Sequence, residues 1–410
     1  MKIHSDICVI GNGVIGKASA LALARAGYTV ALLAPDRAEK SASAASQPLQ
    51  PLWDQRVYAL NHVAKSLLSS LKVWDAMDSS RIAPVDAMAV QGDDQANPGC
   101  LDFNAYGARV GALAWIVEDS NLNRALDSAL SFASGINFIK GRAKQLLYTE
   151  HHVEVMLDDG AMLTTSLIIG ADGANSWVRA QADTSIDYRS YDQSAVVANF
   201  SCTNAHHGIA SQWFLGADGI VALLPLPGQQ VSLVWSAPEV LANRLLAEPS
   251  EKLCERLSAL PGQTLGQFVM LPPSVPKAFP LRLIRSHSLI ANRIALVGDA
   301  AHVVHPLAGQ GMNLGFADVD ALLSILSQSK GVDCGDARLL NRYARLRAEE
   351  VLLMQVTTDG LHRLFSSDLP PVKLLRNAGM RLIDKIPFLK NHLARHALGH
   401  SHSSNTTESF

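Results

Sequence analysis

Three features of the sequence predict an α/β fold in which a domain with a parallel sheet is interleaved with an antiparallel sheet and followed by C-terminal helices. The first is a short apolar strand at residues 6–10 that leads into a glycine-rich turn and an alanine-rich helix. The second is the segment 294–320, where another apolar strand leads through a turn into a helix. The third is a series of short strands between residues 195 and 236.

The N-terminal feature has the order strand, glycine-rich turn, helix, strand, which is typical of a dinucleotide-binding Rossmann unit. We expect Gly11 to make the turn and Gly13 to admit a pyrophosphate. Gly16 is expected to let the helix pack close to the sheet. Such units usually end their second strand in an acidic residue that binds the adenosine ribose. Ala34 stands there in this chain, and Asp36, two residues on, is the candidate for that contact.

The segment 294–320 indicates which dinucleotide is bound. Its strand ends in Gly298-Asp299, and its helix is preceded by further glycines. An aspartate at a strand end can bind the hydroxyls of a polyol, and a glycine-lined helix N-terminus stabilises an anion. A flavin needs both, because it has a ribityl chain and its ring becomes anionic when it is reduced. The segment therefore predicts a flavin site, whereas Gly315 falls one residue too late for a second Rossmann turn.

The short strands in the middle of the chain predict a separate antiparallel layer, because hairpin turns join them and a parallel sheet has no place for such a meander. A hairpin that includes residues 153–157 leads into a strand at residues 167–173, and this pair is a second nucleotide-proximal element of the N-terminal domain. The chain is helical after Ala337. The predicted organisation is a discontinuous FAD-binding domain (residues 1–75, 101–180 and 275–335), a substrate-binding domain (76–100 and 181–274), a C-terminal helical region (336–400) and a disordered tail (401–410).

Composition narrows the functional class. The chain has 410 residues, of which 48% are hydrophobic, and a formal net charge of -2, so a large core is expected and binding to nucleic acid is not. The five cysteines include no CxxC pair, which favours a reducing cytoplasm and argues against a disulfide oxidoreductase or a cysteine zinc site. Three C-terminal histidines at helical spacing lack a nearby carboxylate or cysteine, so no metal site is predicted.

With these elements in place, the chain resembles the ubiquinone-biosynthesis hydroxylase family, whose members are flavin-dependent aromatic hydroxylases with the p-hydroxybenzoate hydroxylase fold. The resemblance covers nearly the whole chain. The motifs that carry it are GNGVIG at Gly11, RVYALN at Arg56, WIVEDSNL at Trp115, GADGANSWVR at Gly170 and GDAAHVVHPLAGQGMNLG at Gly298.

The resemblance implies a set of contacts with non-covalent FAD. Arg56 would lie along the pyrophosphate or the ribityl chain, and Asp299 would bind the ribityl hydroxyls. Asp119 takes a place that an amide usually holds, and Asp172 would serve both FAD and the nicotinamide donor. The full set of implied cofactor-binding residues is Gly11, Gly13, Gly16, Asp36, Arg56, Asp119, Arg124, Asp172, Gly173, Asp299, Gly309, Gly311, Met312 and Asn313.

The reaction that the resemblance implies is hydroxylation of an electron-rich ring. NADH or NADPH reduces FAD, O2 adds to give a flavin C4a-hydroperoxide, and the phenol ring attacks the distal oxygen. Pro306 and His305 are the candidate catalytic residues in the loop beside the flavin ring. His302 and His305 either relay protons or brace this loop.

The substrate implied by the resemblance is a polyprenylated phenol. The strands between residues 195 and 236 contain no Lys or Arg, which favours an apolar ligand. Trp213, Phe214 and Trp235 either line the channel for the tail or belong to the core. The alternatives are a hydroxylase of a small soluble aromatic compound and a non-catalytic flavin-binding subunit of a quinone-synthesis complex.

A lipid-tailed substrate has to be collected from a membrane or from a carrier. The segment 372–398, in which basic residues alternate with Leu and Ile, is the candidate surface for contact with a membrane or with a ubiquinone-biosynthesis protein complex. Its alternative is a helix that packs its apolar side on its own domain. We expect a cytoplasmic protein, peripheral to the inner membrane, and leave homo-oligomer formation open.

Overall fold

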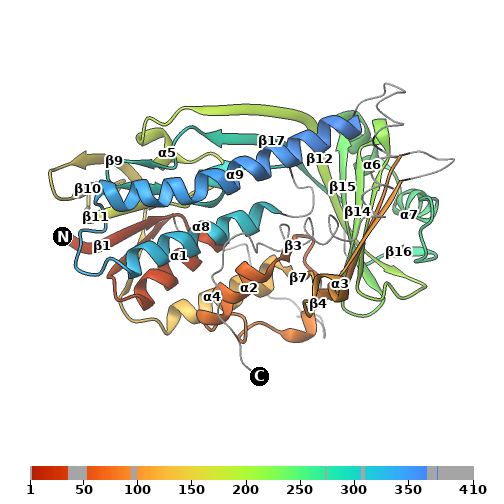
Figure 1. The fold of residues 1–410 in the computed structure, drawn as a ribbon, viewed down its shortest axis with the longest axis horizontal. Helices are drawn as coiled ribbons and strands as arrows, with labels where there is room; N and C mark the ends of the chain where they lie inside the picture. Colours follow the sequence, from red (N-terminus) through yellow and green to blue (C-terminus); the bar gives the residue numbers. More distant parts are fainter. Residues whose placement is uncertain are drawn as a thin grey trace.

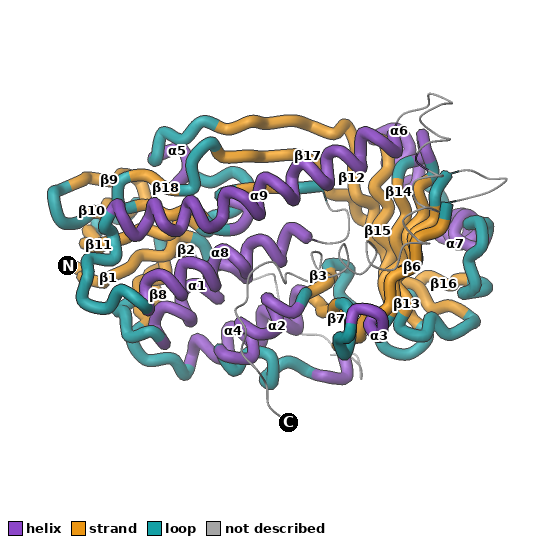
Figure 2. The backbone as a smooth tube through the Cα atoms, viewed as in Figure 1, coloured by secondary structure: helices purple, strands orange, loops and turns teal. Residues whose placement is uncertain are grey.

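The computed structural model describes residues 2–35, 53–93, 99–272, 275–305, 310–366 and 376. These residues form two large sheets at opposite ends of the molecule, with a small three-stranded sheet between them (Figure 1). Figure 2 shows the long helix α9 (Ala337–Ser366) running from one large sheet to the other. The predicted combination of a parallel and an antiparallel sheet with C-terminal helices is confirmed.

The first large sheet has a parallel core, as the glycine-rich N-terminal unit predicts. Its central strands are apolar on both faces because helices and further strands cover them. The strand order is β18 (Ile290–Ala291), β19 (Ile294–Leu296), β11 (Met162–Gly170), β1 (Lys2–Ile10), β2 (Val30–Ala34) and β8 (Ile136–Lys140). In addition, β10 (Val153–Leu157) pairs antiparallel with β11, and β9 (Ala143–Tyr148) pairs antiparallel with β10.

Helix α1 (Val14–Arg25) follows β1 directly and lies between α4 (Asp119–Ser131) and α8 (Gln310–Ser327). It is apolar on nearly all sides because it is buried along most of its length. Its buried stretch contains one charged side chain, Lys17, which is fully buried. The Lys17 Nζ atom lies 2.5 Å from Asp127 Oδ1 and donates to Asn123 Oδ1 at 3.0 Å, so this ammonium group joins α1 to α4.

The second large sheet contains the predicted meander and has nine strands. The four strands predicted at residues 195–236 correspond to the observed strands Ile186–Cys202, Ile209–Phe214, Ile220–Leu226 and Gln230–Pro238. The strand order is β20 (His302–Val303), β17 (Lys277–Ser286), β12 (Ile186–Cys202), β15 (Gln230–Pro238), β14 (Ile220–Leu226), β13 (Ile209–Phe214), β5 (Ala87–Gln91) and β6 (Cys100–Asn104), with β16 (Phe268–Met270) also paired to β12.

The remaining elements connect the sheets or cover them. The three-stranded sheet has the order β3 (Val57–Leu60), β7 (Ala114–Glu118), β4 (Ile82–Val85). The other helices are α2 (His62–Ser70), α3 (Ala105–Ala108), α5 (Trp177–Gln181), α6 (Glu239–Ala247) and α7 (Ser250–Ser258), and the 3-10 turns are η1 (Ser79–Arg81), η2 (Gly216–Asp218) and η3 (Gly298–Ala300). Within the described ranges, no helix combines the length and the apolarity needed to cross a membrane.

Two of the predicted domain boundaries are wrong. The stretch from residue 275 was assigned to the FAD-binding domain, yet β17 pairs with β12 along almost its whole length. Residues 101–104 likewise belong to β6, which pairs with β5 in the nine-stranded sheet. The physical reason is the length of β12, whose seventeen residues reach beyond the meander and offer a second edge on which β17 pairs.

The two faces of the nine-stranded sheet differ, because side chains alternate along each strand. Trp213 and Trp235 lie on the outer face, where they pack with α6 and α7 and donate to the carbonyl oxygens of Pro261 and Asp218. Phe214 points to the opposite face and stacks on Phe365 of α9. Of the three aromatic residues considered for the channel, the two tryptophans therefore belong to the core.

Replacement of Lys17 by methionine should lower the free energy of unfolding by about 1–3 kcal/mol, because Asn123 Oδ1 loses its donor inside the protein. Asp127 is half exposed, so its carboxylate regains water. Urea unfolding measures the difference. The matched control is Lys144→Met at an exposed lysine of β9, for which we expect a change within about 0.5 kcal/mol. Equal effects for the two variants would contradict the assigned role of Lys17.

Candidate functional site

The glycine-rich turn between β1 and α1 has the shape that a pyrophosphate requires. Gly11 has φ +122°, and a Cβ there would overlap the carbonyl oxygen of Ala171. A Cβ at Gly16 would overlap the carbonyl oxygen of Gly11, so this glycine closes the first turn of α1. A Cβ at Gly13, by contrast, meets no atom within 4 Å. The open space at Gly13, at the N-terminus of α1, is where a phosphate group fits.

A second observation supports a nucleotide at this turn. The side-chain oxygen Oδ1 of Asn12 is buried and has no hydrogen-bond partner among the described residues. A buried amide oxygen normally has a donor. A hydroxyl group of a bound dinucleotide would supply one, so the residues present fit FAD at this end of the sheet.

The strand β19 leads into η3, where Gly298 has φ +58°. The next residue, Asp299, has an exposed side chain, yet the surrounding protein raises the pKa of its carboxyl group through desolvation. His302, Arg56 and Arg282 oppose this effect electrostatically. A carboxylate that water reaches although protein surrounds it lies in a recess, which is the environment that a ribityl anchor needs.

One carboxylate, that of Asp318 in α8, fixes the turn that presents Asp299. Asp318 is fully buried, and its Oδ2 accepts from the Gly298 backbone N–H at 2.9 Å and lies 2.7 Å from His302 Nε2. Its Oδ1 accepts from Arg347 Nε of α9 at 2.8 Å. Burial raises the pKa of Asp318, but His302 and Arg347 together outweigh burial and hold it below its usual value.

The wall opposite η3 comes from β3 and the start of α4. Tyr58 Oη donates to Asp119 Oδ1 at 2.6 Å, and Asn123 Nδ2 donates to the same oxygen at 3.0 Å. Burial raises the pKa of Tyr58 far above its usual value, while Arg56, whose guanidinium lies 5.4 Å from the ring centroid, acts in the opposite direction. Arg56 is exposed and acts electrostatically on Asp299, so these two predicted residues share one recess.

The segment after β11 holds its own backbone together. The Asp172 carboxylate accepts from Ser176 Oγ at 2.5 Å and from the backbone N–H groups of the first turn of α5 at 2.7 and 3.1 Å. Gly173, with φ +83°, makes the turn between them. Arg179 donates to the carbonyl oxygens of Ala300 and Ala174 at 2.8 Å each, which joins this turn to η3.

Four further residues that were predicted to bind the cofactor lie in α8 and α4. Asn313 accepts from the Asn61 backbone N–H and donates to the Ala59 carbonyl, both at 2.9 Å, so it ties α8 to the β3–α2 junction. Gly311 has open space around its Cβ position, and Met312 is half-buried against the main core. Arg124 is exposed and donates to the Ser120 carbonyl one turn earlier in α4.

His305 is fully buried at the edge of the nine-stranded sheet. Its ring lies edge-on to Tyr191 with 4.9 Å between the ring centroids, and its Nε2 is 3.4 Å from Gln193 Oε1. The segment that ends at His305 therefore contacts β12 of the nine-stranded sheet. Pro306, Gly309 and Asp36 lie outside the described residues, and their roles stay predictions, as do direct cofactor contacts of the other named residues.

Sequence reasoning missed the residues that hold the site together, namely Asp318, Arg347, Arg179 and Tyr58. A usable signal exists for two of them. Asp318 lies four residues after the buried Leu314, and Arg347 lies four after the buried Tyr343, so both charges occupy core-facing positions of their helices. Opposite charges at core positions of adjacent helices predict a buried ion pair.

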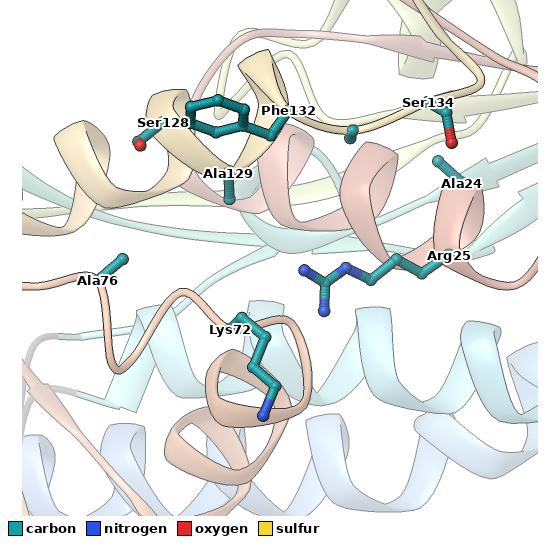
Figure 3. Close-up of a pocket in the computed structure, with 9 residues that line it drawn as sticks. Ala24, Arg25, Lys72, Ala76, Ser128, Ala129, Phe132 and Ser134 are labelled. Carbon is teal, nitrogen blue, oxygen red and sulfur yellow. The ribbon is translucent and has the colours of Figure 1, made fainter.

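A pocket of about 430 Å³ opens elsewhere, between the C-terminal ends of α1 and α4 and the turn after α2. Figure 3 shows Arg25, Lys72 and Phe132 around it. It lies at the opposite end of α1 from Gly13, about 18 Å along a helix of this length. The pocket is therefore separate from the nucleotide turn. No group of His, Cys, Asp and Glu in the described part of the chain could hold a metal ion.

Comparison with known proteins identifies the class. Residues 142–354 match the family model described as FAD binding domain, and residues 6–89 match the model of FAD dependent oxidoreductases. A probable FAD-dependent monooxygenase of Pseudomonas aeruginosa, PqsL, has a TM-score of 0.74 at 22% identity over 92% of this chain and 99% of its own. The p-nitrophenol 4-monooxygenase of Pseudomonas putida has a TM-score of 0.75 at 17% identity, over 98% of this chain and 100% of its own. The fold is that of FAD-dependent monooxygenases.

The curated relatives identify the family. Ubiquinone hydroxylase UbiL of Rhodospirillum rubrum is 33% identical over 96% of this chain and 90% of its own. The 3-demethoxyubiquinol 3-hydroxylase of Escherichia coli is 33% identical over 96% of this chain and 98% of its own. Human ubiquinone biosynthesis monooxygenase COQ6 is 31% identical over 95% of this chain and 91% of its own. The chain belongs to the ubiquinone-biosynthesis hydroxylase family and is an NAD(P)H- and O2-dependent flavin monooxygenase.

Replacing either glycine at the start of α1 by alanine should impair the protein, Gly13→Ala through FAD binding and Gly16→Ala through stability. Gly13→Ala has room in the protein and an ordinary backbone conformation, so the variant should fold with an unchanged Tm but lose FAD, because the methyl group takes the phosphate position. Gly16→Ala should lower the Tm of the FAD-free protein, because its Cβ meets backbone that cannot move aside. Flavin fluorescence and calorimetry separate the two effects. Normal FAD affinity in Gly13→Ala would refute the assignment.

The buried Asp318 predicts a pH-dependent stability. Because its pKa is lower in the folded protein than in the unfolded chain, the ionised carboxylate stabilises the fold above about pH 4. This contribution is lost as the pH falls through the folded-state pKa. Asp318→Asn should therefore cost about 3–5 kcal/mol near pH 7, and the gap to the unchanged protein should narrow as the pH is lowered. A gap that is constant with pH would show that the charge is not involved.

Proposed function

We propose that this protein hydroxylates the aromatic ring of a polyprenylated phenol in ubiquinone biosynthesis. The relatives named for hydroxylation of ubiquinone and of 3-demethoxyubiquinol support this substrate class. The observation in this chain that carries the proposal is the character of the substrate sheet. Residues 195–236 include no Lys or Arg, and the strands that they form lie next to one another in the nine-stranded sheet. An apolar ring with a long apolar tail matches such a surface.

We call the cofactor-side surface of the nine-stranded sheet the inner face, defined by Gln212, Phe214, Ile220, Ala222, Leu224, Ser232 and Val234. Its relation to the cofactor loop follows from two contacts. Tyr191, which packs with Ala195 and Val234, meets the His305 ring. Leu224 packs with Ile116 in β7 of the three-stranded sheet. Arg56 immediately precedes β3 of the same sheet. The inner face is therefore closed by the same elements that surround the flavin position.

The chain's own residues bind and orient the reactants. When bound, FAD supplies the redox and oxygen chemistry of its class. Asp299 would hold the ribityl chain, the turn at Gly13 the pyrophosphate, and the N-terminal turn of α8 the anionic ring. His305 is fully buried, and its ring packs edge-on against Tyr191. This packing would keep water away from the bound flavin ring.

A small soluble aromatic acid is the second candidate substrate. The observation that favours it is Arg282 on β17, which is half-buried, donates to Asn175 Oδ1 at 3.2 Å and lies close enough to Asp299 to act on its pKa. Arg189 on β12 is less suitable because Asp359 of α9 already pairs with it. A carboxylate ligand would need the Arg282 guanidinium to leave Asn175.

Collection of the lipid-tailed substrate from a membrane surface or a protein complex is part of this proposal. The segment 372–398 lies outside the described residues except for Arg376. That residue is buried, and its guanidinium forms an ion pair with Asp93 after β5 and donates to the Leu364 carbonyl at 2.7 Å. Arg376 therefore belongs to the protein interior, and any docking surface in the segment excludes it.

The holoenzyme should oxidise NADH or NADPH faster with a polyprenyl phenol in detergent micelles than with tail-free 4-hydroxybenzoate, because the inner face offers apolar contacts to a tail. The product formed under ¹⁸O2 should carry one labelled oxygen by mass spectrometry. Acid precipitation should release the FAD into solution. Labelled product from 4-hydroxybenzoate alone would favour the small aromatic acid. NAD(P)H oxidation without labelled product from either compound would favour the non-catalytic subunit.

A further inference from the structure

On β13, the inner face carries a polar side chain at Gln212. On β13 the two neighbouring inner-face positions belong to different apolar clusters, Ala210 to the cluster with the three-stranded sheet and Phe214 to the cluster with Phe365 of α9. On β14, Ala222 pairs with Gln212 and lies between members of the same two clusters. Gln212 and Ala222 therefore mark the gap where the two clusters separate.

The side chain at this gap has no partner. Gln212 is 7% exposed, and its amide makes no hydrogen bond to any residue that the structure describes. The amide atoms are not fully enclosed, so the small exposed fraction of the side chain lies at its two donors and its acceptor. The neighbours across the strands are Ala222 and Val90, which have no polar group in their side chains. The amide is therefore placed for a ligand.

A second buried polar group lies on the same face. Ser232 on β15 is fully buried, and its Oγ has no hydrogen-bond partner among the described residues. β14 lies between β13 and β15, so Gln212 and Ser232 are on strands about 10 Å apart. Between them β14 presents Ala222, which pairs with Gln212, and Leu224, which pairs with Ser232. An apolar surface with a polar group at each side has the dimensions and the chemistry of an aromatic ring with oxygen substituents.

We propose that the Gln212 amide orients the substrate by accepting a hydrogen bond from the hydroxyl group of the phenol ring through Oε1. This inference rests on the proposed function and adds a specificity-determining residue to it. When the ring gives electrons to the incoming oxygen, its hydroxyl becomes more acidic, so the O–H···Oε1 bond strengthens in the transition state. A neutral amide also suits a substrate without a carboxylate, because it offers no charge that would have to be buried unpaired.

A thermodynamic cycle tests this directly in the holoenzyme. The ligands are a polyprenyl phenol and the matching polyprenyl benzene that lacks the hydroxyl group, and the readout is the perturbation of flavin absorbance on titration. Gln212→Leu should weaken binding of the phenol about tenfold and leave binding of the benzene unchanged. Gln212→Glu keeps an acceptor oxygen but adds a charge, so it should bind both ligands more weakly and still prefer the phenol to the benzene. The control is Gln267→Leu, which changes an exposed glutamine before β16 and should alter neither ligand.

The outcomes separate this inference from the function on which it rests. Equal weakening of both ligands by Gln212→Leu, or full activity of that variant, would overturn the role of Gln212 while hydroxylation by the unchanged enzyme stands. Loss of the preference for the phenol over the benzene in Gln212→Glu would show that the amide donates instead and would also overturn the proposal as stated. Absence of any flavin perturbation by the phenol in the unchanged enzyme would refute the proposed function itself. If Gln212→Leu does not fold, Gln212→Ala replaces it in the cycle with the same expected outcomes.

Discussion

The carboxylate of Asp318 is the interaction on which the rest of the site depends. Buried without solvent, it accepts hydrogen bonds from Gly298 and Arg347 and pairs with His302. A buried charge is tolerated only when such partners surround it, so the four groups must keep their places together. The strand end that carries Asp299, the helix α8 and the long helix α9 are thereby fixed to one point.

Helix α9 extends this constraint to the substrate side. Arg347 joins its first half to Asp318, and further along the helix Asp359 pairs with Arg189 on β12. At its end Phe365 stacks on Phe214 of the inner face. A single helix thus determines how far the cofactor turn stands from the substrate sheet. In oxygen transfer this distance matters, because the reacting ring must meet the flavin in the correct geometry.

Several residues that sequence motifs associate with FAD turn out to hold loops in place. Asp172 caps α5, Asn313 ties α8 to the β3–α2 junction, and Asp119 holds Tyr58. Such contacts are as indispensable as direct ones, because a glycine-rich turn presents its N–H groups correctly only when its neighbours are fixed. Motif residues therefore mark the site reliably without stating what each side chain touches.

The sequence by itself determined the local elements: the glycine turn at Gly11, the strand that ends at Asp299, the hairpin strands of the meander and the long helix after Ala337. These elements depend on short-range periodicity and on glycine conformations, and both are determined by residues that are adjacent in the sequence. The domain boundary at β17 and the partners of Asp318 and Gln212 depend on which elements meet in space. The periodicity of α8 and α9 indicated the Asp318–Arg347 pair. The inner face and its unpaired amide, by contrast, were decided only by tertiary packing. Alternation along a strand predicts two faces, but it does not predict which of them lies toward the cofactor.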